Sequence, residues 1–290
     1  MYKLIAIDID GTLVDSKGEI SEENKLAIKN AREKGTEVVL TSGRTPQSIK
    51  PIAKEIGSNN YLIAGNGAMV FDIKENKVIY GKYLSKKKVL ELIKICQEND
   101  IFYNIYLNDK IVTETIDYNI LYYDSENKNV APERRVNIEI KNDILKFVKE
   151  YEGDDFLKVA ICEQNKIAFE RIVGILKKMK QISFLDMKQR TVKTIKSENG
   201  NKEIAYYYTE IMDDEVDKWS ALKFLIKKLK IKKQEVLAIG DNINDEEMLK
   251  NAEMGVAMGN SYPRIKEIAN YIAPDNNSNG VADAINKHNI

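Results

Sequence analysis

Short apolar runs alternate with amphipathic stretches over the first part of the chain. The runs at residues 4–7, 38–40 and 61–64 are almost wholly apolar, which is typical of parallel strands buried on both faces. A helical pattern between the first two runs begins after Ser21, a good helix-capping residue, and ends at Gly35. The order strand, helix, strand, helix, strand predicts an α/β sheet.

The middle of the chain does not keep this alternation. Two apolar runs at 69–71 and 78–80 flank a polar turn and predict a hairpin. The elements expected after it are mixed in order, with helices at 85–98 and 165–179 and strands at 102–107 and 157–162. We therefore predict an inserted α+β domain over residues 85–205.

The alternation returns in the last part of the chain. The predicted elements are a helix at 219–229, a strand at 236–239, a helix at 245–251, a strand at 255–258, a helix at 263–269, a strand at 271–273 and a helix from Val281. Residues 1–84 and 206–290 are thus predicted to form one α/β core, a Rossmann-like, doubly wound parallel sheet that carries the α+β domain as an insertion.

Length and charge narrow the class of protein. A single core seldom exceeds about 250–300 residues, so a chain of 290 residues is expected to form two domains. The 45 basic and 45 acidic residues cancel, which argues against nucleic-acid binding. No segment approaches the roughly 18 apolar residues of a membrane span, and the first apolar run stops at Asp8, short of a signal peptide. We expect a cytoplasmic protein that binds neither nucleic acid nor membrane.

Histidine and cysteine content excludes further classes of site. His288 is the only histidine and lies near the C-terminus, which argues against Ser-His-Asp hydrolysis and histidine-rich zinc sites. Cys96 and Cys162 have no Cys-x-x-Cys partner, so we interpret both as buried structural thiols.

Two carboxylates stand at the end of the first predicted strand. Asp8 and Asp10 are two residues apart, so both side chains face the same way at the strand end, where ligands bind in open α/β sheets. A divalent cation would relieve their mutual repulsion. A turn without chemistry is the alternative. A calcium loop is rejected because Leu13 occupies the position that requires glycine.

A second acidic segment, Gly240-Asp241-Asn242-Ile243-Asn244-Asp245, directly follows the predicted strand at 236–239. Strand ends of a parallel sheet share one edge, so Asp241 is expected to meet Asp8 and Asp10. Oxygen-only ligands favour a hard cation, of which Mg²⁺ is the commonest at phosphate sites. A polar helix cap is the alternative interpretation of this segment.

Two further segments suit phosphate binding. Ser42-Gly43-Arg44 ends the strand at 38–40 and offers a hydroxyl, a flexible amide and a helix N-terminus. Lys218 opens the helix before the Asp241 strand and would bring positive charge to phosphoryl oxygens. Neither segment is specific by itself, since Ser-Gly also marks plain turns and lysine is abundant.

Taken in order, these segments resemble the four motifs of the haloacid dehalogenase superfamily. The tail segments at 255–260 and 279–282, and Asn66-Gly67-Ala68, are similar to its Cof-type sugar-phosphatase branch. The likeness covers the core at both ends. The middle matches in position and length the α+β cap that this branch inserts between its second and third motifs.

The resemblance implies a Mg²⁺-dependent phosphatase. Asp8 would be the nucleophile, forming an aspartyl phosphate, and a metal ligand. Asp10 would protonate the leaving oxygen and then activate water, its backbone carbonyl touching the metal that Asp241 completes. The supporting residues would be Ser42, Gly43, Lys218 and Asn244 for phosphate, Asp245 for orienting the site, and Arg44 and Asn66 as candidate substrate contacts. Two positions depart from the branch, with Trp219 in place of glycine after Lys218, and Ser42 where threonine is frequent.

The expected reaction is hydrolysis of a small phosphorylated metabolite, a sugar phosphate or a phosphorylated cofactor. The cap would close over the leaving group and select it. Two alternatives remain open: a phosphotransferase or mutase on the same scaffold, and a non-catalytic protein that binds a metabolite. Retention of Asp8, Asp10, Lys218 and Asp241 speaks against the second alternative.

Overall fold

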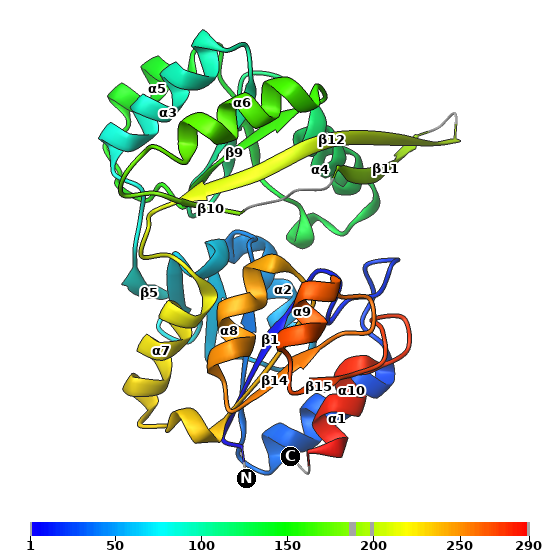
Figure 1. Ribbon diagram of the computed structural model, residues 1–290. Helices are drawn as coiled ribbons and strands as arrows, with labels where there is room; N and C mark the ends of the chain where they lie inside the picture. Colours follow the sequence, from blue (N-terminus) through cyan, green and yellow to red (C-terminus); the bar gives the residue numbers. More distant parts are fainter. Residues whose placement is uncertain (1, 186–189, 198–199, 289–290) are drawn as a thin grey trace. The chain divides into compact units, whose positions relative to one another are not determined.

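The structure is a computed structural model that describes residues 2–185, 190–197 and 200–288 (Figure 1). The chain forms two compact units, one of Met1–Gly81 with Val216–Ile290 and one of Lys82–Glu215. The second unit starts slightly before the predicted domain at 85–205 and ends clearly after it. The later end arises because the long strand β12 (Gly200–Met212) continues past residue 205.

The strand that ends at Asp8 lies in the interior of the first unit's sheet. The sheet order is β15 (Tyr271–Ile272), β14 (Met254–Ala257), β13 (Val236–Gly240), β1 (Leu4–Asp8), β2 (Glu37–Thr41), β3 (Tyr61–Ala64), β4 (Met69–Asp72) and β5 (Lys77–Gly81). Neighbours are parallel from β15 to β3, and β4 and β5 add an antiparallel edge. The predicted parallel sheet and the hairpin are confirmed.

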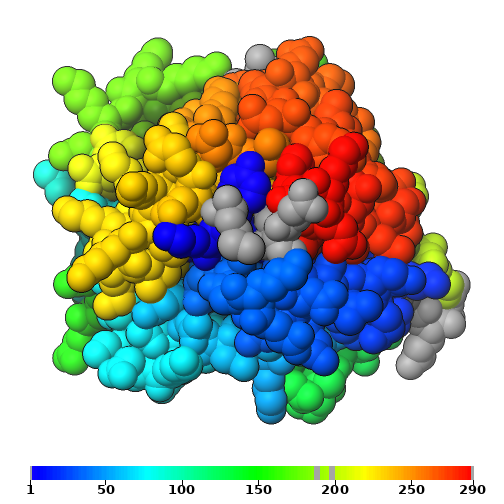
Figure 2. Space-filling view, turned by 90° about the horizontal axis from the view of Figure 1, so that it is seen from below, coloured from blue at the N-terminus to red at the C-terminus, as the bar shows by residue number. Residues whose placement is uncertain are grey.

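Helices cover both faces of this sheet. Alternate strand residues such as Leu4 and Ala6 form an apolar cluster with α7 (Lys218–Leu229), α8 (Glu246–Asn251) and α9 (Pro263–Ile268). The helices α1 (Glu22–Glu33), α2 (Pro46–Glu55) and α10 (Gly280–Lys287) belong to the other layer, in which α1 and α10 pack together. Figure 2 shows the first segments (blue) and the last segments (orange and red) side by side on this unit's surface. The doubly wound α/β class is confirmed.

The second unit is built on a mixed sheet. Its order is β10 (Ser183–Phe184), β12, β9 (Lys158–Glu163), β6 (Phe102–Tyr106), β7 (Ile111–Thr113) and β8 (Ile138–Ile140), and β11 (Thr191–Ser197) pairs with β12 as a hairpin. One face buries an apolar cluster beneath α3 (Lys86–Glu98), α5 (Ile144–Glu150) and α6 (Lys166–Leu176). The expected α+β character is therefore present.

The helix α4 (Tyr118–Asn129) is absent from the sequence prediction. Its apolar side chains do not gather on one face, so it gives no amphipathic signal. It packs against β11 and β12 and places the polar side chain of Asn119 against the sheet. Asn119 accepts hydrogen bonds from Asn104 Nδ2 at 2.9 Å and from Cys162 Sγ at 3.2 Å. Both cysteines are buried and unbridged, as expected.

A buried ion pair lies on the face of the second unit's sheet that Asn119 of α4 contacts. Lys158 and Glu210 are 2% and 7% exposed and are bonded to each other. The Lys158 amine lies 4.3 Å from the centroid of the Tyr106 ring, and the Tyr208 hydroxyl also donates to Glu210. Since a buried charge is costly without its partner, each member of this pair depends on the other.

Replacing Lys158 with methionine is expected to lower the free energy of unfolding by about 3 kcal/mol, because the buried Glu210 carboxylate would lose the ammonium that it contacts. The combined change Lys158→Met and Glu210→Gln is expected to lower the free energy of unfolding by less, since neither charge of the pair remains. Denaturant unfolding measures both. Lys166→Met is the control, since its pair with Glu170 on α6 is exposed and should contribute about 0.5 kcal/mol or less. Equal stability of Lys158→Met and Lys166→Met would contradict this prediction.

Among the residues that the structure describes, no helix combines the length and the apolar character that a membrane span requires.

Candidate active site

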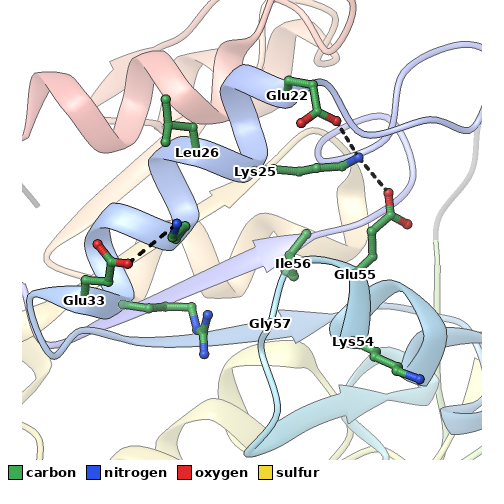
Figure 3. A pocket seen from close by; sticks show the side chains of 10 residues that line it. Glu22, Lys25, Leu26, Glu33, Lys54, Glu55, Ile56 and Gly57 are labelled. Atoms are coloured by element: carbon green, nitrogen blue, oxygen red, sulfur yellow. Dashed lines mark hydrogen bonds and ion pairs between the residues drawn. The ribbon is translucent and has the colours of Figure 1, made fainter.

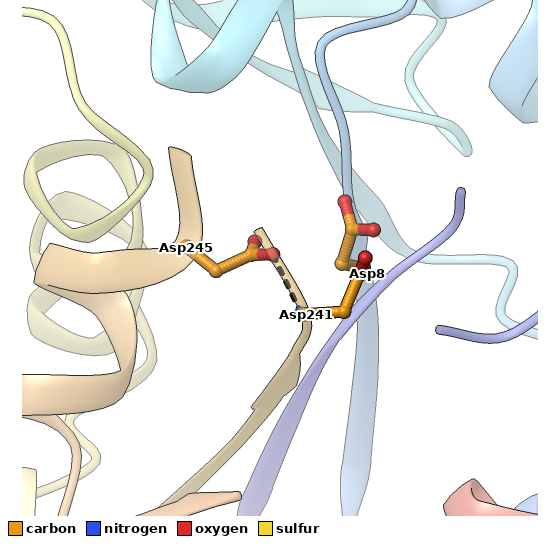
Figure 4. A group of neighbouring side chains, drawn as sticks. All are labelled: Asp8, Asp241 and Asp245. Carbon is orange, nitrogen blue, oxygen red and sulfur yellow. Dashed lines mark hydrogen bonds between the residues drawn. The ribbon is translucent and has the colours of Figure 1, made fainter. Parts of the chain in front are cut away.

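Three buried carboxylates meet at the carboxyl edge of the first unit's sheet (Figure 4). Asp8 ends β1, Asp241 follows β13, and Asp245 ends the short 3-10 helix η4 (Ile243–Asp245). Because β1 and β13 are parallel neighbours, with Ile7 opposite Ile239, their ends place Asp8 beside Asp241. One oxygen from each of the three carboxylates lies within 4.8 Å of the other two.

The amine of Lys218 lies among these carboxylates. It donates to Asp8 Oδ1 and to Asp245 Oδ1, each at 2.5 Å, and its side chain is fully buried. Lys218 is the first residue of α7, and the Asp217 side chain caps the helix by accepting from the Ser220 amide. Trp219 packs partly buried against the apolar cluster of this unit. The Lys218 amine therefore reaches the site although tryptophan follows it, at the position where the branch that the sequence resembles usually has glycine.

Local backbone geometry holds Asp241 and Asp245 in place. Asp245 Oδ2 accepts the backbone N–H groups of Asp241 and Asn242, each at 3.0 Å. A Cβ at Gly240 would lie 2.5 Å from Asp245 Cγ, and one at Gly11, where φ is +83°, would lie 2.5 Å from Asp241 Oδ2. Glycine is thus required at both positions for the chain to approach so closely.

Burial and charge together shift the site's pKa values. Burial raises the pKa of Asp8 well above its ordinary value, and the neighbouring carboxylates raise it further, against the lowering effect of Lys218. Burial, and then the charge of Asp245, raise the pKa of Asp241 to about 7. Burial alone would lower the pKa of Lys218, but Asp245 and Asp8 outweigh it and the net shift is upward. The cluster carries more negative charge than one amine can balance.

Asp10 does not join this group of carboxylates. Its side chain forms a two-pronged ion pair with Arg44, with Nε 2.8 Å from Oδ2 and Nη2 2.6 Å from Oδ1. The pair is partly exposed, with 56% of the Asp10 side chain accessible. The two acidic residues of the first motif thus have different surroundings: Asp8 is buried beside a lysine, and Asp10 is exposed beside an arginine.

Ser42 and Gly43 follow β2, beside the end of β1. The register pairs Asp8 with Thr41, so Ser42 lies at the same sheet edge. Ser42 is 1% exposed and its hydroxyl accepts the Arg44 amide at 3.2 Å. Asn244, in η4, donates from Nδ2 to Asn66 Oδ1 at 3.0 Å. Every predicted site residue therefore lies on segments of the first unit. Besides the contacts of Lys218, direct pairings join Asp10 with Arg44 and Asn66 with Asn244.

The structure adds residues to which the sequence gave no role. Thr12 Oγ1 donates to Asp241 Oδ1 at 2.8 Å, which ties the first motif to the last. Asn260 Nδ2 donates to the Gly11 carbonyl at 2.8 Å and supports the same turn. Thr12 belongs to the first motif, and Asn260 to the tail segment at 255–260, but neither segment indicates which partner the side chain meets. Asp245 is also closer to the centre of the site than its predicted supporting role implied.

A groove between α1 and α2 is separate from the carboxylate cluster (Figure 3). Its charges are largely paired within the groove: Lys25 contacts Glu22 at 2.8 Å and Glu55 at 3.0 Å. It has no residue in common with the site around Asp8.

Known proteins match the chain over nearly its whole length. The family model for haloacid dehalogenase-like hydrolases matches residues 5–285. The phosphatase YwpJ of Bacillus subtilis is 29% identical, with 97% of each chain covered. The 5-amino-6-(5-phospho-D-ribitylamino)uracil phosphatase YcsE of the same organism is 31% identical over 98% of this chain and 94% of its own.

A solved structure of a haloacid dehalogenase-like hydrolase shares the fold of this chain. A haloacid dehalogenase-like hydrolase from B. subtilis superposes with a TM-score of 0.81 at 27% identity, covering 99% of this chain and 100% of its own. The resemblance on which the enzyme class was predicted is thereby confirmed, together with the phosphatase class itself. The chain therefore belongs to the haloacid dehalogenase-like hydrolase family.

Proposed function

We propose that this protein hydrolyses small phosphate monoesters with the help of Mg²⁺, through an aspartyl phosphate formed on Asp8. The observation that carries the proposal is the buried group of Asp8, Asp241 and Asp245 around Lys218. A buried carboxylate next to a lysine at a strand end suits a nucleophile whose attack splits one difficult displacement into two easier ones.

The donor set fits a hard divalent cation. When all three carboxylates are ionised, with oxygens within 4.8 Å of one another and one lysine beside them, two negative charges remain that a doubly charged ion would neutralise. Asp8 and Asp241 are the proposed ligands, with the Asp10 backbone carbonyl, and Asp245 lies close enough to assist. When bound, the ion would supply positive charge at the reacting phosphoryl group.

The protein groups would carry out the bond changes. An Asp8 carboxylate oxygen attacks phosphorus, and the bond from phosphorus to the ester oxygen breaks as Asp10 gives that oxygen a proton. In the second half, Asp10 takes a proton from water, whose oxygen attacks phosphorus, and the bond to Asp8 breaks to release inorganic phosphate. Because Arg44 engages both Asp10 oxygens, this ion pair must open before Asp10 can hold a proton for the leaving group.

The substrate class is proposed to be a sugar phosphate or a phosphorylated cofactor. The relative YcsE is named for 5-amino-6-(5-phospho-D-ribitylamino)uracil, a small metabolite whose phosphate is on a ribityl chain. We propose that the second unit, Lys82–Glu215, acts as the specificity cap of the family, and that its side chains influence which ester is accepted.

Phosphate release from a panel of monoesters tests the proposal. With Mg²⁺ we expect turnover of at least some sugar phosphates or phosphorylated cofactors. Chelation should lower turnover by about a hundredfold or more, because the negative charge of the carboxylates would be left uncompensated at the phosphate, and added Mg²⁺ should restore it. Undiminished hydrolysis after chelation would contradict the metal requirement. Transfer of the phosphoryl group to a sugar without phosphate release would favour the transferase alternative.

A further inference from the structure

The turn η1 (Gly65–Gly67) connects β3 to β4 in an unusual backbone conformation. Its central residue, Asn66, has φ +59° and ψ +26°, the left-handed region that asparagine tolerates better than most residues but that glycine adopts without cost. Asn66 is nevertheless only 2% exposed. Glycine would adopt this backbone conformation without strain. The presence of a buried asparagine here therefore indicates that its side chain has a role.

The backbone of this turn is joined to the proposed phosphate-binding segment. The Gly65 amide donates to the Arg44 carbonyl, and the Asn66 amide donates to the Ser42 carbonyl, both at 3.0 Å. The two hydrogen bonds fix the turn against the residues that follow β2. Any movement of the turn is thereby coupled to Ser42 and Arg44.

The next residue brings the turn against the start of α7. A Cβ at Gly67, where φ is +101°, would lie 2.1 Å from the Asp217 carbonyl oxygen and 2.9 Å from the Lys218 amide nitrogen. Only glycine permits this approach. The same three-residue turn therefore touches the segment that begins with Lys218.

The Asn66 side chain reaches the last motif. Its Oδ1 accepts from Asn244 Nδ2 at 3.0 Å, and among the described residues this is the contact that orients the Asn244 amide. Asn244 Oδ1 is buried and has no hydrogen-bond partner in the part of the chain that the structure describes. Without Asn66, neither Nδ2 nor Oδ1 of Asn244 would have a hydrogen-bond partner among the described residues. The orientation of the Asn244 amide therefore depends on Asn66.

We infer that Asn66 is a positioning residue of the phosphatase, which orients the Asn244 amide toward the phosphoryl group and acts through it instead of touching substrate. This inference rests on the proposed function and on the role that the family resemblance implies for Asn244, which is to bind phosphate. It assigns Asn66 a different role from the substrate contact that the sequence suggested. The turn as a whole contacts the segments that contain Ser42, Lys218 and Asn244.

A double-mutant cycle tests the inference. Asn66→Gly removes the side chain that accepts the hydrogen bond from Asn244 and keeps the left-handed backbone unstrained. We expect kcat/KM to fall by about tenfold, roughly the value of one hydrogen bond near a charged group, and Asn244→Ala to cost at least as much. The double variant should be no slower than Asn244→Ala, since the side chains act as one unit.

Matched controls separate positioning from general folding. Asn76→Gly changes another asparagine with positive φ, at +50°, in the exposed turn between β4 and β5, and should leave kcat/KM unchanged. Thermal melting of each variant reports the fold. If Asn66→Gly does not fold, Asn66→Ser, whose hydroxyl is too short to replace the amide oxygen, takes its place in the cycle.

The results that would contradict this inference differ from those that would contradict the proposed function. Lack of turnover in the wild-type protein would refute the proposed hydrolysis, but calorimetric binding of inorganic phosphate would still show whether Asn66→Gly and Asn244→Ala weaken it as one unit. Unchanged kcat/KM and phosphate affinity in Asn66→Gly would overturn the positioning role. Losses that multiply in the double variant would also overturn it, because Asn66 would then act independently of Asn244.

Discussion

Replacing Asp8 with asparagine is expected to lower kcat for phosphate esters by roughly 10⁴-fold or more, because the amide cannot serve as the nucleophile. The substitution keeps the size of the side chain and an oxygen acceptor for Lys218. It also removes a negative charge from a crowded, buried group, so the variant should melt at or above the wild-type temperature in the absence of metal. Phosphate release under single-turnover and steady-state conditions, together with thermal melting, measures both effects.

Asp72→Asn is the matched control for this experiment. Asp72 also ends a strand of the first unit, β4, and is 8% exposed, but its Oδ1 caps a turn by accepting the Glu75 amide. Its replacement should leave turnover close to wild type. Retention of full activity in Asp8→Asn would refute the nucleophilic role of Asp8, and a comparable loss in Asp72→Asn would mean that the assay reports folding.

The second large effect is expected at Lys218. Lys218→Met keeps most of the side-chain length but removes the fully buried amine that contacts both Asp8 and Asp245. We expect kcat/KM to fall by roughly 10³-fold, because the positive charge beside the nucleophile and the phosphoryl oxygens is lost. The free energy of unfolding should also fall by about 3–5 kcal/mol, since three buried carboxylates would remain without a cation.

Magnesium separates the two consequences of Lys218→Met. Added Mg²⁺ should recover part of the lost stability by neutralising the carboxylates, but it should not restore turnover. Lys223→Met is the control, because Lys223 lies on the same helix, α7, and is exposed. Wild-type kcat/KM in Lys218→Met would be incompatible with the proposed site, as would an unfolding free energy that does not respond to Mg²⁺.

The core of the site could be predicted because strand periodicity determines where side chains emerge. The apolar runs before Asp8 and Asp241 identify two buried parallel strands, and the ends of parallel neighbours share an edge. That reasoning needs no knowledge of side-chain contacts. It therefore brings the two aspartates together, although Asp241 comes 233 positions after Asp8 in the sequence.

The pairings within the site could not be predicted in the same way. Strand alternation would place Asp8 and Asp10 on one side, but β1 ends at Asp8, and in the turn that follows Asp10 pairs with Arg44. The central position of Asp245 depends on a 3-10 turn whose carboxylate accepts two backbone amides. Such contacts are decided by loop geometry, for which the sequence has no periodic signal.

The second unit was the least predictable part of the fold. Its polar sheet face and the helix α4 lack the separation of apolar and polar residues on which sequence patterns depend. The buried pair of Lys158 with Glu210 places charges where a strand pattern favours apolar residues. The second compact unit extends beyond residue 205 because β12 runs from a hairpin into the sheet without an interruption in its sequence.

The insertion determines the order in which the protein is completed during synthesis. β1 pairs with β2 and with β13, but β13 begins only at Val236. At about 5–20 residues per second, the ribosome delivers β13 ten seconds or more after β1, and it delivers all of Lys82–Glu215 in between. The second unit, with its own apolar cluster, can fold while β1 still presents an open edge. Lys218, Asp241 and Asp245 all follow the second unit in the sequence, so the proposed site can assemble only after that unit has been synthesised.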